Sequence, residues 1–235
     1  MKEVPYTYQI IAAITAISFF VPFIVLMARH LLKHRMFLWF AVYWLVAGVV
    51  NLLYYSATFT SSPLMVVTER LYNLADAPFM LFILYKTSHI EPIKNSIRKM
   101  LPAFLWTALL ITIITRLQDY AETLMVGVGL GIILMYIIWT IVHYIRGIKH
   151  ENAAYSMQFI YYALLFEYGV SVVTFIYNYI LPEQSALQDS FLIYNLSTII
   201  SVSVASYGLV NYKEKPAITK KNSNKKPREA EITFL

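Results

Sequence analysis

The stretch ERLYNLADAP (residues 69–78) places charged and polar side chains inside a long apolar run. A membrane-spanning helix needs about 20 mostly apolar residues, and residues 64–87 provide that length. A charged group at mid-bilayer costs about 2.5–3.5 kcal/mol on insertion scales, so such groups almost always face a bundle interior or a wet cavity. Glu69, Tyr72, Asn73 and Asp76 lie at i, i+3, i+4 and i+7, on one helical stripe. The stretch therefore predicts a membrane helix with its polar stripe turned inward.

The composition of the whole chain is that of a membrane protein. It is 59% hydrophobic and 14% charged, whereas soluble domains carry about 25% charged residues. There is no Cys, so disulfides are excluded. The net charge of +6 lies in short links and the tail rather than on a folded polar face, which argues against nucleic-acid binding. We predict an all-α fold, a bundle of seven transmembrane helices near residues 8–28, 36–58, 64–87, 101–117, 122–145, 154–181 and 190–212.

The Lys and Arg residues predict the orientation of this bundle. The first, third and fifth links and the tail are basic, whereas the other links are mainly acidic, with Asp119, Glu122, Glu183 and Asp189. Cytoplasmic loops carry the Lys/Arg excess, so the N-terminus is expected outside and the C-terminus in the cytoplasm. We therefore expect a multi-pass protein of the cytoplasmic membrane, with a transmembrane domain over 1–212. The polar, basic segment 213–235 is expected to be a disordered tail.

The chain also contains a candidate internal repeat. LYNL (71–74) and IYNL (193–196) align Tyr72 with Tyr194 and Asn73 with Asn195 at one constant offset. This alignment predicts that the first three and last three spans are parallel copies joined by the fourth, as in some small transporters.

Two further polar stripes are expected to face the same interior. Glu167, Ser171, Thr174 and Asn178 share one face of the sixth span, and the seventh span has Tyr194 and a narrow row of small hydroxyl residues. The predicted ligand- or ion-binding residues are Glu69, Tyr72, Asn73, Asp76, Glu167, Ser171, Tyr194, Asn195 and Ser201. No catalytic residue and no metal ligand is assigned, because the five His residues lie at or near span edges.

The two central acids each allow more than one interpretation. Asp76 is either an ion, proton or ligand site, or a buried carboxyl that is protonated or paired with Arg70 and only fixes helix packing. Glu167 suits proton handling, and a neutral Glu bonded to Tyr or Ser explains it equally well. Pro78 follows Asp76 by two residues and is expected to free the carbonyl of Leu74, which would open the helix locally.

A pair of glycines in the fifth span carries a packing prediction. Gly127 and Gly131 form a small-xxx-small pair, which favours close helix approach. We expect them to pack against a neighbouring helix or against a second copy of the chain in a homo-oligomer, so a bulky residue at Gly131 should impair folding.

Seven spans with this orientation and DAPFMLF (76–82) in the third span resemble the microbial rhodopsins, closest to their sodium-pump branch. The resemblance implies that Asp76 occupies the family's ion- and proton-handling position, while Tyr72 and Ile83 replace the branch's Asn and Gln. VSVASYGL (202–209) is similar to the end of the family's seventh helix. Val204, however, stands where the retinal-binding lysine should be, so the chain cannot form a retinal Schiff base.

Two functions remain open from the sequence. The first is a retinal-free receptor or sensor that binds a small apolar ligand non-covalently, without a covalent cofactor, among aromatic residues expected to face inward: Tyr72, Phe79, Tyr162, Phe166, Tyr168 and Tyr194. The second is a small-solute or ion transporter coupled to protons through Asp76 or Glu167. An intramembrane enzyme lacks a catalytic constellation. The expected partners are the lipid bilayer and a small molecule or ion.

Overall fold

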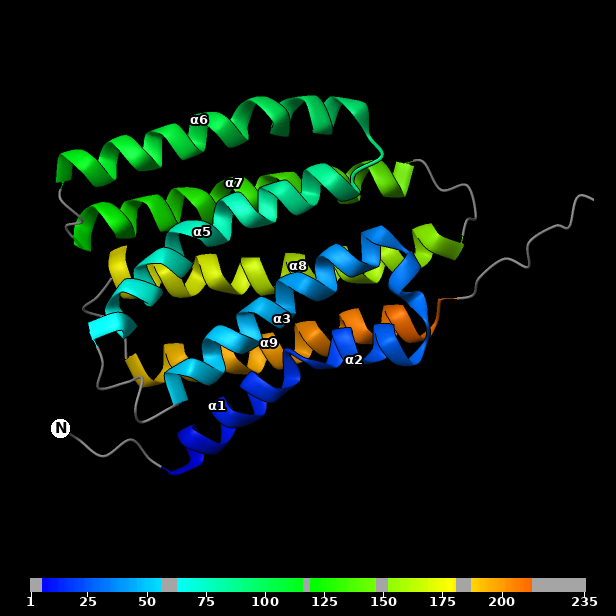
Figure 1. The fold of residues 1–235 in the computed structure, drawn as a ribbon, viewed down its shortest axis with the longest axis horizontal. Coiled ribbons are helices and arrows are strands. Elements are labelled where there is room, and N and C mark those ends of the chain that lie inside the picture. The colour runs from blue at the N-terminus through cyan, green and yellow to red at the C-terminus, as the bar shows by residue number, and fades with distance from the viewer. Residues whose placement is uncertain (1–5, 56–62, 116–118, 147–151, 181–186, 213–235) are drawn as a thin grey trace, which may run out of the picture.

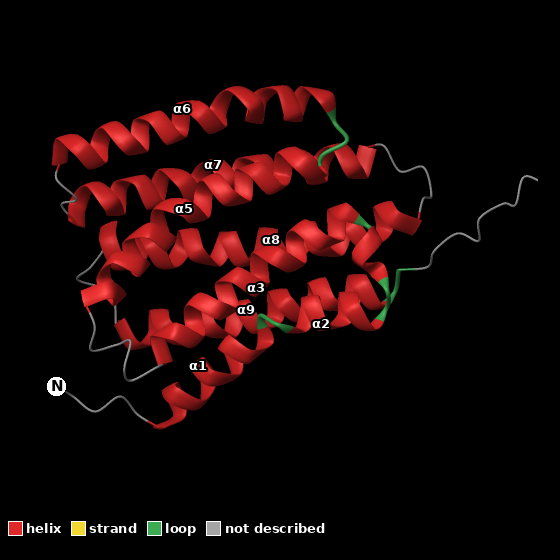
Figure 2. Cartoon of the chain, in the orientation of Figure 1, coloured by secondary structure: helices red, strands yellow, loops and turns green. Residues whose placement is uncertain are grey.

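The computed structural model describes residues 6–55, 63–115, 119–146, 152–180 and 187–212, and these ranges contain helices and no strand (Figure 2). The elements follow the order α1 (Tyr6–Ser18), α2 (Val21–Ala28), the 3₁₀ turn η1 (Leu31–Lys33), α3 (Arg35–Tyr55), α5 (Pro63–Thr87), α6 (Glu91–Thr115), α7 (Asp119–Arg146), α8 (Asn152–Phe175), the π-helical turn η2 (Ile176–Ile180) and α9 (Leu187–Val210). The prediction of an all-helical fold is confirmed. The proposed tail, 213–235, lies outside the described residues.

Six of the described helical segments are long and apolar enough to cross a membrane. They are α1 with α2, α3, α6, α7, α8 with η2, and α9. The chain is thus a multi-pass membrane protein by length and composition. The third predicted span, α5, has the required length but is not among the six, because it carries Glu69, Arg70, Asp76 and Lys86.

The contacts between helices close a ring, and one helix lies outside it. Contacts join α9 to α1 and α2, these two to α3, α3 to α5, α5 to α7, α7 to α8, and α8 back to α9. Among the described residues, the main contacts of helix α6 are with α5 and α7, and α6 forms one edge of the molecule in Figure 1. One end of the bundle contains η2, the starts of α5, α7 and α9, and the end of α3. We call it the η2 end.

The first predicted span is broken rather than continuous. Helix α1 ends at Ser18, and α2 begins at Val21 with Pro22 in its first turn. Proline lacks the N–H that the preceding turn would use, so it favours a new helix start at this place.

Helix α5 stays continuous from Pro63 to Thr87 with Pro78 inside it. The local opening predicted at Pro78 is therefore wrong. Tight packing surrounds this position, because Ala77 and Met80 are buried and hold the helix on both sides of the proline.

The glycines of α7 mark close approach, but not as the sequence predicted. A Cβ on Gly129 would lie 2.7 Å from the Cβ of Ala77 on α5, and a Cβ on Gly127 would meet the ring of Phe175. Gly131 is exposed, and a Cβ there would meet nothing within 4 Å. The predicted close approach of Gly131 to a neighbouring helix of the same chain is thus wrong, because this residue faces away from those helices, whereas its contact with a second copy stays a prediction.

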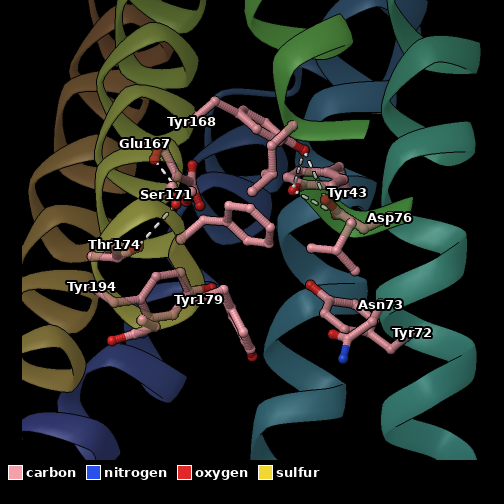
Figure 3. A pocket seen from close by; sticks show the side chains of 14 residues that line it. Tyr43, Tyr72, Asn73, Asp76, Glu167, Tyr168, Ser171, Thr174, Tyr179 and Tyr194 are labelled. Carbon is pink, nitrogen blue, oxygen red and sulfur yellow. Dashed lines mark hydrogen bonds between the residues drawn. The ribbon is translucent and has the colours of Figure 1, made fainter. Parts of the chain in front are cut away.

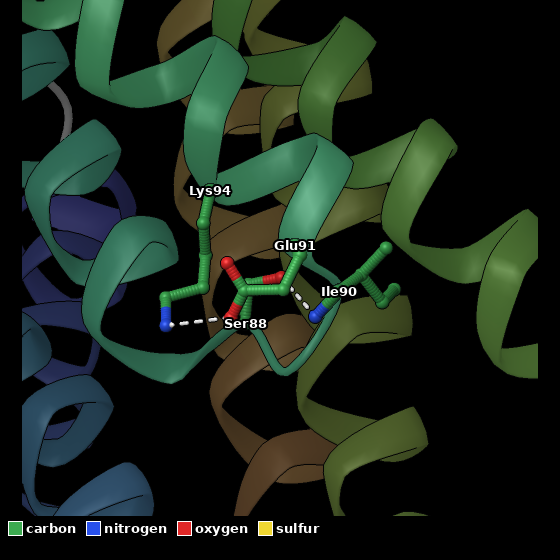
Figure 4. A network of polar contacts seen from close by, with 4 residues as sticks. All are labelled: Ser88, Ile90, Glu91 and Lys94. Carbon is green, nitrogen blue, oxygen red and sulfur yellow. Dashed lines mark hydrogen bonds and ion pairs between the residues drawn. The ribbon is translucent and has the colours of Figure 1, made fainter.

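Helix α6 begins ten residues earlier than residue 101, where the predicted span starts. Figure 4 shows the turn before it, where the Ser88 hydroxyl accepts the Ile90 N–H at 3.2 Å. An exposed ion pair between Lys94 Nζ and Glu91 Oε1, at 3.3 Å, lies in the first turn. These turns are polar, so a search for apolar runs does not detect them.

Candidate functional site

A cavity of about 210 Å³ lies inside the ring of helices, in the half nearest the η2 end. Figure 3 shows side chains from facing helices converging on it. The fourteen lining residues come from α3, α5, α7, α8, η2 and α9: Tyr43, Tyr72, Asn73, Asp76, Val126, Leu130, Glu167, Tyr168, Ser171, Thr174, Phe175, Asn178, Tyr179 and Tyr194. Polar groups from four helices and η2 therefore share one interior space.

Asp76 is held at the floor of the cavity by two tyrosines. The Tyr43 hydroxyl lies 3.0 Å from Asp76 Oδ1, and the Tyr168 hydroxyl donates to Oδ2 at 3.2 Å. The two hydroxyl oxygens are 2.8 Å apart, so each lies within hydrogen-bond distance of the carboxyl group and of the other hydroxyl. Both tyrosines are buried, at 6% and 2% exposure. Buried polar groups need partners. The hydroxyls of Tyr43 and Tyr168 provide these partners for the Asp76 carboxyl group without any cation.

Glu167 also lines this cavity, and only one of its two carboxylate oxygens accepts a hydrogen bond within the described part of the chain. Its side chain is 6% exposed, and Oε2 accepts the indole N–H of the fully buried Trp44 at 3.2 Å. Within the described part of the chain, this indole provides the only hydrogen bond to the Glu167 carboxylate. The neighbouring hydroxyls of Ser171 and Thr174 donate to carbonyls of their own helix instead. Glu167 Oε1 therefore lines the cavity without a donor.

Burial decreases along α8 and η2 toward the η2 end. Thr174 is 9% exposed, whereas Tyr179 is 60% exposed. The amide oxygen of Asn178, which lines this part of the cavity, is buried and has no hydrogen-bond partner among the described residues. The cavity thus leads from a buried acidic floor toward an exposed rim.

An ionic contact between α5 and α7 lies next to the cavity. Glu122 accepts the Asn73 amide N–H at Oε1, 3.2 Å away, and its Oε2 lies 3.6 Å from Nε of Arg70. The Arg70 side chain is 30% exposed and that of Glu122 is 14% exposed. Arg70 therefore forms an ion pair with Glu122, and the partners of Asp76 are Tyr43 and Tyr168 rather than Arg70.

The structure brings together six of the nine residues predicted as a site. These are Tyr72, Asn73, Asp76, Glu167, Ser171 and Tyr194. Asn195 and Ser201 are buried elsewhere: the Asn195 amide donates to the Phe191 carbonyl at 2.8 Å, and neither residue lines the cavity. Their hydroxyl-rich helix face packs against neighbouring helices instead. The side chain of Glu69 lies outside the described side chains.

Sequence reasoning missed Tyr43 and Trp44 and misplaced two aromatic residues. Helix α3 is apolar on all sides, so no polar stripe marked the face that carries Tyr43. Tyr162 and Phe166 were expected inside but are 40% and 43% exposed, on the outer face of α8. The useful signal was the aromatic pair Tyr43–Trp44, whose O–H and N–H need partners when buried.

The fold and the cavity define a multi-pass helical membrane protein with an acidic, tyrosine-lined interior. No protein family, no curated protein and no solved structure matches the chain. The resemblance to microbial rhodopsins and the parallel repeat therefore stay predictions.

Proposed function

We propose that this protein binds a small molecule in the cavity formed by α3, α5, α7, α8, η2 and α9. The observation that supports this most directly is the Glu167 carboxylate, which is almost fully buried and still has an oxygen without a donor on the cavity wall. Because this oxygen is open to the cavity, a ligand there, or ordered water, can donate a hydrogen bond to it.

The size of the cavity limits the ligand. About 210 Å³ exceeds an engineered cavity of about 150 Å³ that binds benzene. It is smaller than the pockets of about 300–1,000 Å³ that hold drug-sized ligands. The space suits a molecule with on the order of ten non-hydrogen atoms.

The packing beyond the cavity floor favours binding over transport. Met80, Leu84, Ile133 and Ile137 are fully or almost fully buried on the far side of Asp76, away from the η2 end. A proton-coupled transporter that uses Asp76 and Glu167, the second function left open by the sequence, would require this apolar layer to open. Flux into liposomes under a pH gradient would support the transporter.

The binding proposal is tested with three probes of matched shape: 2-phenylethanol, phenethylamine and phenylacetate, which are neutral, cationic and anionic at pH 7. Purified protein in detergent micelles is titrated with each probe by ligand-observed NMR. We expect at least one probe to bind, and Ser171→Phe, which fills the cavity, should abolish that binding. Val126→Phe fills the same space from α7 and serves if the first variant does not fold.

The matched control is Val173→Phe, which adds the same ring on the exposed face of α8. It should bind the probe as the unmodified protein does, and it controls for probe that dissolves in micelles. If no probe distinguishes the unmodified protein from the cavity-filled variants, the proposal is refuted.

A further inference from the structure

The charges on the cavity wall are all of one sign. Of the fourteen lining residues, Asp76 and Glu167 are acidic, and none is Lys, Arg or His. Arg70 forms an ion pair with Glu122, and neither of these residues lines the cavity. An ionised carboxylate away from water needs a compensating charge. In the described part of the chain, no side chain on the cavity wall provides it.

Two acceptor atoms on this wall are unsatisfied. Glu167 Oε1 and the amide oxygen of Asn178 have no donor among the described residues. Both residues lie on the continuous helical segment formed by α8 and η2, and both line the cavity. A matching ligand therefore brings N–H or O–H donors to these two atoms.

The remaining wall is mainly aromatic. Six lining side chains carry aromatic rings: Tyr43, Tyr72, Tyr168, Phe175, Tyr179 and Tyr194. The face of an aromatic ring attracts a cation, with about 0.5–2 kcal/mol gained per contact depending on desolvation. Figure 3 shows Tyr179 and Tyr194 on the side of the cavity opposite Tyr72, with the acids above them in that view.

These three observations together select one class of ligand. We infer that the cavity takes a small organic cation, a protonated amine whose ammonium group lies by Asp76 and Glu167 and whose apolar part lies among the tyrosines. This inference rests on the proposed binding function. An anion would be repelled by both acids. A bare metal ion is a poorer fit, because hard cations need about six to eight oxygen ligands, whereas an alkylammonium group has only about three N–H donors to satisfy.

The three probes separate this inference from the proposed function. Phenethylamine and 2-phenylethanol have nearly the same shape and differ in charge. The amine should bind at least about tenfold more tightly than the alcohol, and phenylacetate should bind most weakly. Asp76→Asn and Glu167→Gln keep the side-chain shape and remove the charge, so each should reduce the ratio of amine to alcohol affinity several-fold.

The outcomes are distinct. If the alcohol binds as tightly as the amine, or phenylacetate binds best, the cation inference is overturned while the binding proposal stands. If none of the probes is sensitive to Ser171→Phe, both fail together. The ratio measured on the unmodified protein decides by itself, so a charge-removing variant that does not fold leaves the test intact. A salt titration that weakens the amine and not the alcohol would add independent support.

Discussion

Helices α5 and α7 approach each other closely at Gly129 but not at Gly131. We therefore predict that alanine at these two positions changes the free energy of unfolding in opposite directions. A Cβ on Gly129 would lie 2.7 Å from the Cβ of Ala77 and 3.4 Å from a ring carbon of Phe104. Carbon atoms prefer a separation of about 3.5–4.0 Å, so the two helices must part by about 1 Å. The Cβ of Ala77 is fixed to the backbone and cannot rotate away. Gly131 has open space at the same position.

The magnitudes follow from these two environments. Overpacking costs about 1–3 kcal/mol, and replacing a helical glycine by alanine returns about 0.5–1 kcal/mol. Gly129→Ala should therefore lower the free energy of unfolding by about 1–2 kcal/mol. Gly131→Ala should raise it by about 0.5–1 kcal/mol, because only the backbone effect remains.

Equilibrium unfolding in mixed micelles with increasing dodecyl sulfate, followed by helical circular dichroism, measures both variants under the same conditions. Because Ala77 follows Asp76 directly, Gly129→Ala should also weaken probe binding in the cavity. Equal stability of the two variants would refute the packing argument. Destabilisation by Gly131→Ala would refute the statement that this face of α7 is unpacked.

Three further substitutions test the polar contacts. Asp76→Leu should abolish probe binding in the NMR titration with a loss of stability of only about 1 kcal/mol, because Tyr43 and Tyr168 can still bond to each other; intact binding would refute the site assignment. Trp44→Phe and Glu167→Leu, combined in a double-mutant cycle of unfolding free energies, should show coupling of about 1–2 kcal/mol from the indole hydrogen bond, and additive effects would contradict it. Glu122→Gln should cost less than about 1 kcal/mol in the same unfolding assay, since its partner Arg70 is partly exposed; a larger loss would show that the contact is structural.

The sequence predicted the positions of the helices well, but predicted less well which side chains face the interior of the bundle. Length and hydropathy located α3, α5, α7, α8 and α9 to within a few residues, because a bilayer fixes the length of an apolar run. The break between α1 and α2 and the polar start of α6 were missed, since both depend on local backbone geometry and capping rather than on hydropathy.

The candidate site divides in the same way. Asp76 and Glu167 could be predicted to line a shared interior, because ionisable groups in a membrane helix turn away from lipid. Tyr43 could not, because α3 is apolar on every side and only tertiary contacts decide which face turns to Asp76. Asn195 and Ser201 share helical spacing with true lining residues, but their face of α9 is covered by neighbouring helices.

The apolar layer beneath Asp76 has a kinetic consequence. A molecule bound as we propose would meet buried Met80 and Leu84 beyond Asp76, whereas the route past Asn178 and Tyr179 leads to the exposed rim. Arrival and departure then share one barrier, so a narrower opening slows both rates. Because Tyr179 also lines the cavity, Tyr179→Trp should change the dissociation constant as well as the two rates.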